Sequence, residues 1–170
     1  MPDIFKRATR VLVCSVLFCA PAQLFQVVAS PAHARGEASR TQIILNLIAV
    51  IKNSDDRSTR FGKSHELAVT IYRAKRSGHS LDKSVIRGLG DLMEVPEARF
   101  WTALAIGQLG SRASSLAPKL MAAFDDESRR KQERLKREGI LIDQGEDPQE
   151  GICVALKRIG AEAPKSCSEG

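Results

Sequence analysis

The chain has 170 residues, of which 26 are basic and 20 acidic, so its formal net charge is +6. A chain of this length has room for one domain of ordinary size. Aromatic residues make up 5% of the composition, too few for the stacking surfaces of a single-strand nucleic-acid binder. Basic and acidic residues alternate along most of the chain, which excludes the concentrated basic surface that nucleic-acid binding requires.

The first 34 residues have the pattern of an export signal. Lys6, Arg7 and Arg10 precede an apolar run, and Ala32-His33-Ala34 offers an A-x-A cleavage site. The alternative is an uncleaved anchor, but prolines and glutamines interrupt the run, whereas a membrane-spanning helix needs about 20 predominantly apolar residues. We therefore expect cleavage after Ala34, a periplasmic or secreted mature protein, and membrane attachment only through a retained signal.

The mature chain, residues 35–170, keeps a mild positive charge and two cysteines, Cys153 and Cys167. An even pair of cysteines in an oxidising compartment predicts a disulfide. The closed loop of about 15 residues would add about 3 kcal/mol to stability in the chain-entropy account. Two free thiols are the alternative.

Most of the mature chain has the periodicity of helices. Residues 35–40 are small and polar, which predicts a flexible leader. From Thr41 onward, apolar residues recur three and four positions apart, as on one face of a helix. No segment shows sustained two-residue alternation bounded by a hairpin turn, so the predicted fold class is all-α. The six expected helices run from 41 to a polar turn at 53–56, then about 62–76, 82–93, 97–109, onward from 114 or 115, and 147–160.

A nine-residue phrase occurs twice, from Ala105 to Ala113 and from Ala155 to Ala163. Both copies read A-[IL]-x-x-[LI]-G-x-x-A. Each is an apolar helical stripe that ends at a glycine, the usual residue just past a helix. Its recurrence indicates stacked helical hairpins rather than one irregular bundle.

The segment around the first copy resembles a HEAT repeat of the short variety that also occurs in bilin-lyase-type proteins. The matching positions are Pro96 in the turn, Arg99 at the start of the second helix, and the stop at Leu109-Gly110. The last hairpin matches only through its copy of the phrase, and the first hairpin lacks the terminal Leu-Gly.

The resemblance implies a short α-solenoid of three helical hairpins, about 41–76, 82–110 and 115–160. The repeat domain would then cover 41–164 and leave 165–170 as a C-terminal tail. A generic six-helix bundle with a coincidental repeat is the alternative.

The third hairpin departs from this pattern through a charged excursion over 125–150. Its first part is rich in both charge signs around Leu135 and predicts an outward, ion-paired extension of the fifth helix that ends at Gly139. Three apolar residues follow, Ile140, Leu141 and Ile142. A long charged segment on a compact scaffold is a common place for function, although a solvated protrusion without a partner is the simpler interpretation.

The mature chain has few residues suited to catalysis. His65-Glu66 lacks the second histidine that an H-E-x-x-H zinc site needs, and the two cysteines lack the C-x-x-C spacing of structural zinc sites. Gly62-Lys63-Ser64 lacks the first glycine of a phosphate loop, because that position is Arg57. We therefore expect no metal, no cofactor and no catalytic site, and the protein is not predicted to be an enzyme.

The sequence favours an exported HEAT-repeat-like protein-binding or scaffold module of the cell envelope, with another protein as its partner. The expected contact surface is the groove lined by the second helices, with Arg60, Arg99 and Arg112 as candidates. Leu135 and the segment Ile140-Leu141-Ile142 form a second candidate site. Arg99 also has a structural alternative, in which it ties a turn to the next repeat.

Two other functions stay open. One is an accessory subunit or small enzyme that acts on an envelope substrate. The other is a structural solenoid piece that associates with itself, since an array of three repeats leaves two open ends. The sequence leaves the oligomeric state open.

Overall fold

The computed structural model describes residues 31–138 and 146–168, with side chains from Ser39 onward. The predicted signal lies almost wholly outside these ranges, as do Ile140, Leu141 and Ile142. Every regular element within them is helical and none is a strand, which confirms the all-α prediction. None of the described helices combines the length and hydropathy that a membrane-spanning segment requires.

The described part of the chain contains six α-helices and three short 3-10 elements. Their bounds are α1 Pro31–Asn53, α2 Arg57–Arg76, α3 Lys83–Leu92, α4 Arg99–Leu109, α5 Ala117–Glu138 and α6 Pro148–Ile159. Short 3-10 turns are η1 Pro96–Ala98 before α4, η2 Gly110–Leu116 between α4 and α5, and η3 Lys165–Ser168 after α6.

Three of the helices begin after an aspartate whose side chain accepts hydrogen bonds from the first turn: Asp56 before α2, Asp82 before α3 and Asp147 before α6. Such caps satisfy backbone N–H groups that have no partner within the helix. Pro148 then occupies the first position of α6, where its missing N–H costs nothing.

The cap at Asp56 explains why α2 begins at Arg57 and not near residue 62 as expected. The hydroxyls of Thr59 and Ser58 donate to the Asp56 carboxylate, as does the Thr59 N–H. Together they lower the pKa of Asp56 to about 2. The sequence predicts that Asp56 belongs to a polar turn, because the apolar stripe of α2 does not reach back to its first turn.

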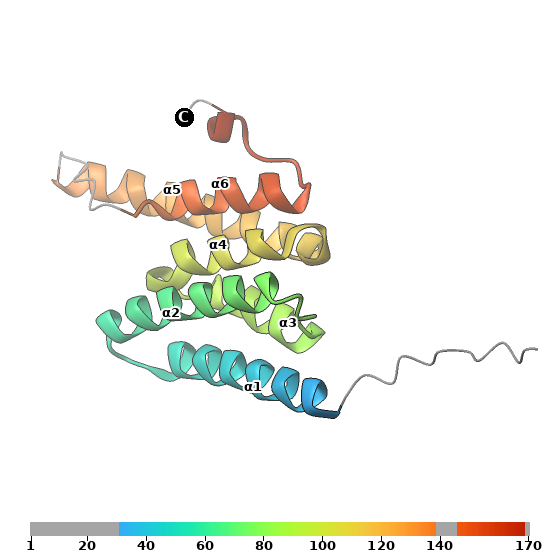
Figure 1. Ribbon diagram of the computed structural model, residues 1–170. Helices are drawn as coiled ribbons and strands as arrows, with labels where there is room; N and C mark the ends of the chain where they lie inside the picture. Colours follow the sequence, from blue (N-terminus) through green and yellow to red (C-terminus); the bar gives the residue numbers. More distant parts are fainter. Residues whose placement is uncertain (1–30, 139–145, 169–170) are drawn as a thin grey trace, which may run out of the picture.

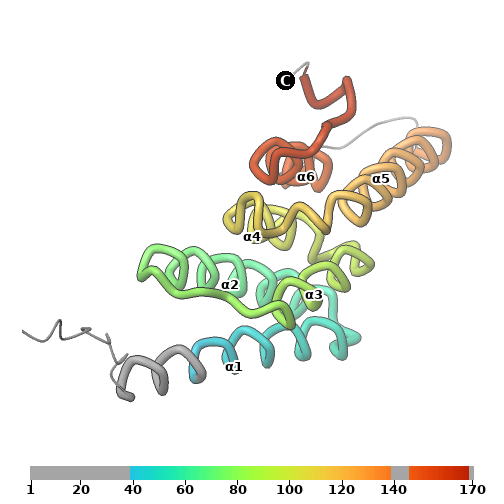
Figure 2. The backbone as a smooth tube through the Cα atoms, turned by 90° about the vertical axis from the view of Figure 1, so that its right-hand side faces the viewer, coloured from blue at the N-terminus to red at the C-terminus, as the bar shows by residue number. Residues whose placement is uncertain are grey.

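The helices α2, α4 and α6 form a stack in which each one packs on the next. α4 packs on α2, and α6 packs on α4. α1 packs on both α2 and α3, and α5 packs on α6. Figure 1 shows this stack from α1 at one end to α6 at the other. A quarter turn away, Figure 2 shows α2, α4 and α6 in one column, with α3 and α5 beside it.

One continuous apolar core fills the space between the helices. The inward positions expected for the first two helices are all buried, because each helix presents its apolar stripe to the next. Tyr72 of α2 is 44% exposed and lies outside this core. The largest fully buried side chains include Ile44 and Ile51 of α1, Leu67 and Ile71 of α2, Leu89 and Leu92 of α3, Ile106 of α4, Leu120 of α5, and Ile152 and Leu156 of α6.

The two copies of the repeated phrase lie on α4 and α6, which pack directly on each other. Within each copy the helix ends at a glycine with positive φ, +61° at Gly110 and +76° at Gly160. A Cβ on Gly107 would lie 3.2 Å from Ala155 Cα, and a Cβ on Gly151 would lie 3.1 Å from the Phe100 carbonyl oxygen. Phe100 and Gly151 both lie near the first residues of their helices, and Gly107 and Ala155 both lie further along them. The helices α4 and α6 are therefore parallel and closely packed.

Two segments at the ends of the domain differ from the expectation. Residues 35–40, expected to be a flexible leader, lie within α1, which begins at Pro31. Proline suits a first helical position, and most of the residues that follow are good helix formers. Residues 165–168, expected as a tail, form η3, and Cys167 is buried.

The close approach of α4 and α6 predicts opposite effects for two glycine substitutions. Gly107→Val would push its side chain against the Ala155 backbone and should lower the free energy of unfolding by about 2 kcal/mol. Gly62→Ala has no atom within 4 Å of the new Cβ and should raise it by about 0.5 kcal/mol, because alanine favours a helix over glycine. Urea unfolding measures both. Equal effects at the two sites would contradict the close approach.

Candidate partner-binding site

Arg99 is a buried cation at the start of α4, 5% exposed. Its Nε donates to the Met93 carbonyl oxygen at 2.8 Å, in the turn before α4. Its Nη1 donates to Asp126 Oδ2 at 2.7 Å and to the Glu127 carboxylate, both on α5. One side chain therefore joins the α3–α4 turn to the middle of α5.

The same interaction sets the charge state of Asp126. The hydrogen bond from Arg99 holds the pKa of the Asp126 carboxyl below its ordinary value, against the opposing effect of burial, and Arg130 adds a second hydrogen bond. Glu127 is 7% exposed, so its negative charge depends on Arg99 for compensation within the protein. A buried charge that loses its partner is strongly unfavourable.

Arg60 repeats this geometry one hairpin earlier. Its Nε donates to the Ser54 carbonyl oxygen at 2.6 Å, six residues before it, as Arg99 does to Met93. Its Nη1 lies 3.4 Å from Glu97 Oε2 in the next turn. Both arginines therefore tie a turn to the following hairpin. The Arg99 side chain is buried and engaged, which fits the alternative in which it ties a turn to the next repeat. Arg60 is half-buried and similarly engaged.

Beyond Glu127, α5 continues as an exposed extension over 128–138. Apart from the half-buried Ser128 and Lys131, its residues are exposed. Figure 2 shows this half of α5 leading away from the column of α2, α4 and α6. Arg129 and Arg130 both pair with Asp126 at its base. The described part of α5 extends outward to Glu138, as expected for the fifth helix, and Gly139 lies outside the described residues.

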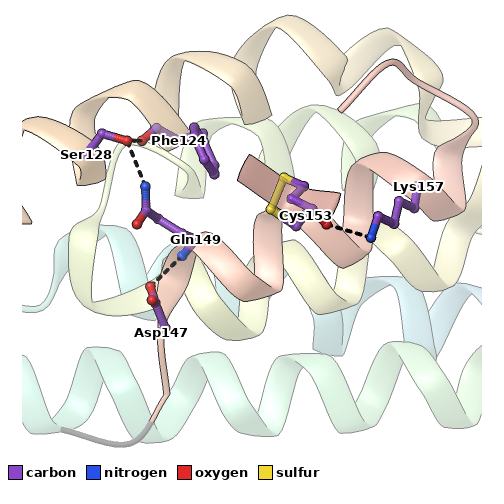
Figure 3. Close-up of a disulfide and its surroundings, with 7 residues drawn as sticks. Phe124, Ser128, Asp147, Gln149, Cys153 and Lys157 are labelled. Atoms are coloured by element: carbon purple, nitrogen blue, oxygen red, sulfur yellow. Dashed lines mark hydrogen bonds between the residues drawn. A yellow bond between two sulfur atoms is a disulfide. The ribbon is translucent and has the colours of Figure 1, made fainter. Parts of the chain in front are cut away.

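A cleft of about 510 Å³ lies between α5, α6 and η3. We call it the α5–α6 cleft, and Figure 3 shows part of its lining. The lining combines an aromatic ring, a disulfide and polar side chains, and consists of Phe124, Ser128 and Lys131 of α5, Asp147 before α6, Gln149, Glu150, Cys153, Val154 and Lys157 of α6, and Ser166 and Cys167 of η3.

Two polar contacts join the α5 wall of the cleft to the start of α6. Gln149 Nε2 donates to Ser128 Oγ at 2.7 Å, and Lys131 Nζ donates to Asp147 Oδ2 at 3.1 Å. Asp147 also caps α6 (Figure 3). The two walls therefore meet through hydrogen bonds on one side of the cleft.

The third wall is fixed covalently. Cys153 of α6 and Cys167 of η3 form a disulfide, with their Cα atoms 5.4 Å apart. Lys157 Nζ donates to the Cys167 carbonyl oxygen at 2.7 Å (Figure 3). The C-terminal turn is thereby held against α6. A cross-link of this kind restricts the unfolded chain and gives the cleft a wall of defined position.

Leu135 extends the cleft wall along α5. Phe124, Ser128, Lys131 and Leu135 are spaced by four, three and four residues, which places them on one face of a helix. The first three line the cleft, and Leu135 is 45% exposed further out. An apolar side chain thus continues the cleft surface onto the exposed extension.

A larger hollow of about 760 Å³ lies beside another face of α5 and is lined mainly by charged residues. Many of these charges already have partners at the base of the hollow. Arg57 pairs with Glu97 at 3.1 Å, and Arg130 pairs with Asp126 at 2.9 Å. Much of the charge that lines the hollow is therefore neutralised by ion pairs between its own residues. The hollow presents fewer unpaired groups to a partner than its size suggests, so we place the candidate site in the α5–α6 cleft.

Arg112 lies away from both sites, in η2. Its Nη2 donates to Ser80 Oγ at 3.0 Å and to the Leu81 carbonyl oxygen at 2.9 Å. It does not share a surface with Arg60 and Arg99. The three arginines predicted to line one groove therefore each hydrogen-bond to a different turn, as Arg60 does to Ser54, Arg99 to Met93 and Arg112 to Leu81.

Histidines and acids do not form a metal site in the described ranges, where no three His, Cys, Asp or Glu side chains converge. His65 instead packs against Trp101, with ring centroids 4.3 Å apart. Trp101 also meets Phe100 edge to face at 5.1 Å. His65 therefore has an aromatic packing role between α2 and α4.

Comparison with family models, with curated proteins and with solved structures finds no match for this chain. The resemblance to HEAT repeats therefore rests on the residues and on how the helices stack. Inference about function rests on the sites themselves.

The Arg99 contacts predict a large and pH-dependent loss of stability for Arg99→Met. The variant leaves Glu127 buried without a cation. Its free energy of unfolding at pH 7 should therefore be about 3 kcal/mol lower than that of the unsubstituted protein. The lowered pKa of Asp126 contributes stability above the ordinary carboxyl value of 3.8, and this contribution is lost as pH falls through the folded-state value. Urea unfolding at pH 7 and pH 3 should therefore show a smaller difference at pH 3.

Arg129→Met is the matched control, because Arg129 pairs with the same Asp126 from a side chain that is 73% exposed. It should cost less than about 0.5 kcal/mol. Similar losses in the two variants would mean that the burial of Arg99 is not what matters.

Proposed function

We propose that the protein is an exported, non-catalytic protein-binding module of the cell envelope, built as a short α-solenoid of three HEAT-like hairpins. The partner is a segment of another protein that binds in the α5–α6 cleft and along α5 as far as Leu135.

Three features support the solenoid. The second helices of successive hairpins stack on one another, as expected when each repeat contacts its neighbours. Arg60 and Arg99 make equivalent contacts one hairpin apart. The helical parts of the repeated phrase lie on α4 and α6, and in each copy the helix ends at a glycine with positive φ.

The observation that supports the proposed binding site is that the walls of the α5–α6 cleft are fixed and that an exposed apolar side chain lies next to them. The disulfide, the Gln149–Ser128 bond and the Lys131–Asp147 bond hold the cleft open at a set width. Rigid walls reduce the entropy that binding must overcome. Leu135 is the one large apolar side chain exposed on the described part of α5, and it lies in line with the cleft.

Export is supported by two features. A disulfide forms and persists in oxidising compartments. Cleavage after Ala34 would shorten α1 only at its beginning and would keep Ile44, Leu47, Ile48 and Ile51, the residues that α1 buries.

Site-specific photo-cross-linking in the native cell envelope tests this function. A benzophenone side chain at Leu135 or Ser166 should give one discrete heterologous product, whereas the same group at exposed Lys75 of α2 should not. With that partner purified, Leu135→Asp should weaken binding at least tenfold, about 1.4 kcal/mol. Ala122→Asp adds the same charge on the opposite, exposed face of α5 and should leave binding unchanged. Products at all three positions, or equal effects of the two aspartates, would contradict the proposal.

Self-association is a second candidate function, favoured by the outer surface of α1. Ile43 and Val50 lie two turns apart on this helix and are 49% and 43% exposed. They lie at the end of the stack, where a further helix would cover them. A cross-linked product of twice the chain mass from a benzophenone at Ile43, with none at Leu135, would favour this function.

A further inference from the structure

A separate pocket of about 530 Å³ lies between α3 and η2. Its apolar part consists of Leu81, Ile86 and Leu116. Leu81 and Leu116 are 4% and 7% exposed, and Ile86 is half-buried, so these side chains offer a surface anchored in the core. This volume, with apolar side chains beside a few polar ones, is typical of small-molecule sites. We call it the basic pocket, for the residues at its rim.

Three cations, Lys83, Arg87 and Arg112, lie at the rim of the basic pocket. None of the described residues that line it is acidic. Within the described ranges neither Lys83 nor Arg87 makes an ion pair, although many cations elsewhere on the domain do. The rim therefore carries positive charge without an internal counter-charge.

The acids nearest in sequence are engaged elsewhere. Asp82 caps α3 and accepts from the Ser84 N–H and hydroxyl at 2.8 and 2.9 Å. Asp91 accepts from Lys119 and Lys52 at 2.9 and 3.2 Å. Asp91 is thereby neutralised away from the rim, whereas Asp82 keeps its charge beside Lys83 but is not among the residues that line the pocket.

Arg112 is held in place without being neutralised. Its Nη2 donates to Ser80 Oγ and to the Leu81 carbonyl oxygen. Both acceptors are uncharged, and both contacts use one of the three guanidinium nitrogens. Because the side chain is already positioned, less entropy is lost when an anion binds.

We propose that the basic pocket binds one anionic amphiphile, a carboxylate on a hydrocarbon chain. The carboxylate lies against Arg112, Arg87 and Lys83, and the chain lies on Leu81, Ile86 and Leu116. Arginine suits this role because its planar fork matches a carboxylate. The site is distinct from the α5–α6 cleft, so the inference goes beyond the proposed protein-binding function and does not depend on it.

Isothermal titration calorimetry with dodecanoate below its micelle concentration tests the proposal. Dodecanoate should bind with one-to-one stoichiometry, and its affinity should fall as salt is raised. Acetate, which has the headgroup alone, and dodecanol, which has the chain alone, should each bind at least tenfold more weakly.

Variants locate the site. Arg112→Met and Arg87→Met should each weaken dodecanoate binding about tenfold, and Arg87 is exposed, so its replacement leaves the fold intact. Arg73→Met removes the same charge from the exposed surface of α2 and should change nothing. Absence of dodecanoate binding, equal binding of dodecanol, or an equal loss in Arg73→Met would overturn the proposal.

One further arm distinguishes a free amphiphile from a membrane lipid. The proposal assigns the pocket to the free amphiphile, so the protein should not float with phosphatidylglycerol vesicles at physiological salt. If the protein floats with the vesicles, loses this flotation in Arg112→Met and does not bind dodecanoate, the cations at the rim bind a membrane surface. That result would overturn the proposal.

Discussion

The placement of α5 depends on one buried cation. Arg99 reaches from the first turn of α4 to a carbonyl oxygen in the preceding turn and to two carboxylates in the middle of α5. Helix packing alone leaves α5 with one extensive helix neighbour, α6, and its second half extends past the stack. The Arg99 contacts add a directional constraint at the point where the packed half of α5 meets the exposed half. The α5–α6 cleft owes one wall to this constraint.

The opposite wall of the cleft, formed by α6 and η3, is held in place by other interactions. α6 lies on α4 at the close distance that Gly107 and Gly151 permit, and η3 is joined to α6 by the disulfide. One wall of the cleft is thus positioned by a buried ion pair, and the other by close packing and a covalent bond. Such a frame keeps an exposed surface in one geometry, which favours the binding of a partner over loose association. The basic pocket at α3 and η2 is independent of this frame.

Local sequence patterns predicted much of the fold. The all-helical class, the buried stripe of α1, the position of α6 and its stop at Gly160 follow from spacing and from single residues that act on their own neighbours. The start of α2 was misplaced because Asp56 was interpreted as part of a turn, and a cap differs from a turn only in the hydrogen bonds that its side chain makes.

The candidate site was less accessible from sequence. Arg99 stood out through the resemblance to a repeat, but its partners on α5 are 27 and 28 residues away, and no local pattern links them. Leu135 was identified because it is an apolar residue among charges, whereas Gln149 and Ser128 were missed because ordinary polar residues carry no signal until the fold brings them together. The basic pocket was missed for the same reason, since Lys83, Arg87 and Arg112 come from two elements.

Hydrogen exchange on α5 tests most directly whether Arg99 fixes this helix against the stack. In Arg99→Met, the amides of α5 near Asp126 and Glu127 should exchange at least tenfold faster than in the unsubstituted protein, while those of α1 and α2 keep their rates. Unchanged exchange in α5, or an equal rise in every helix, would contradict the account.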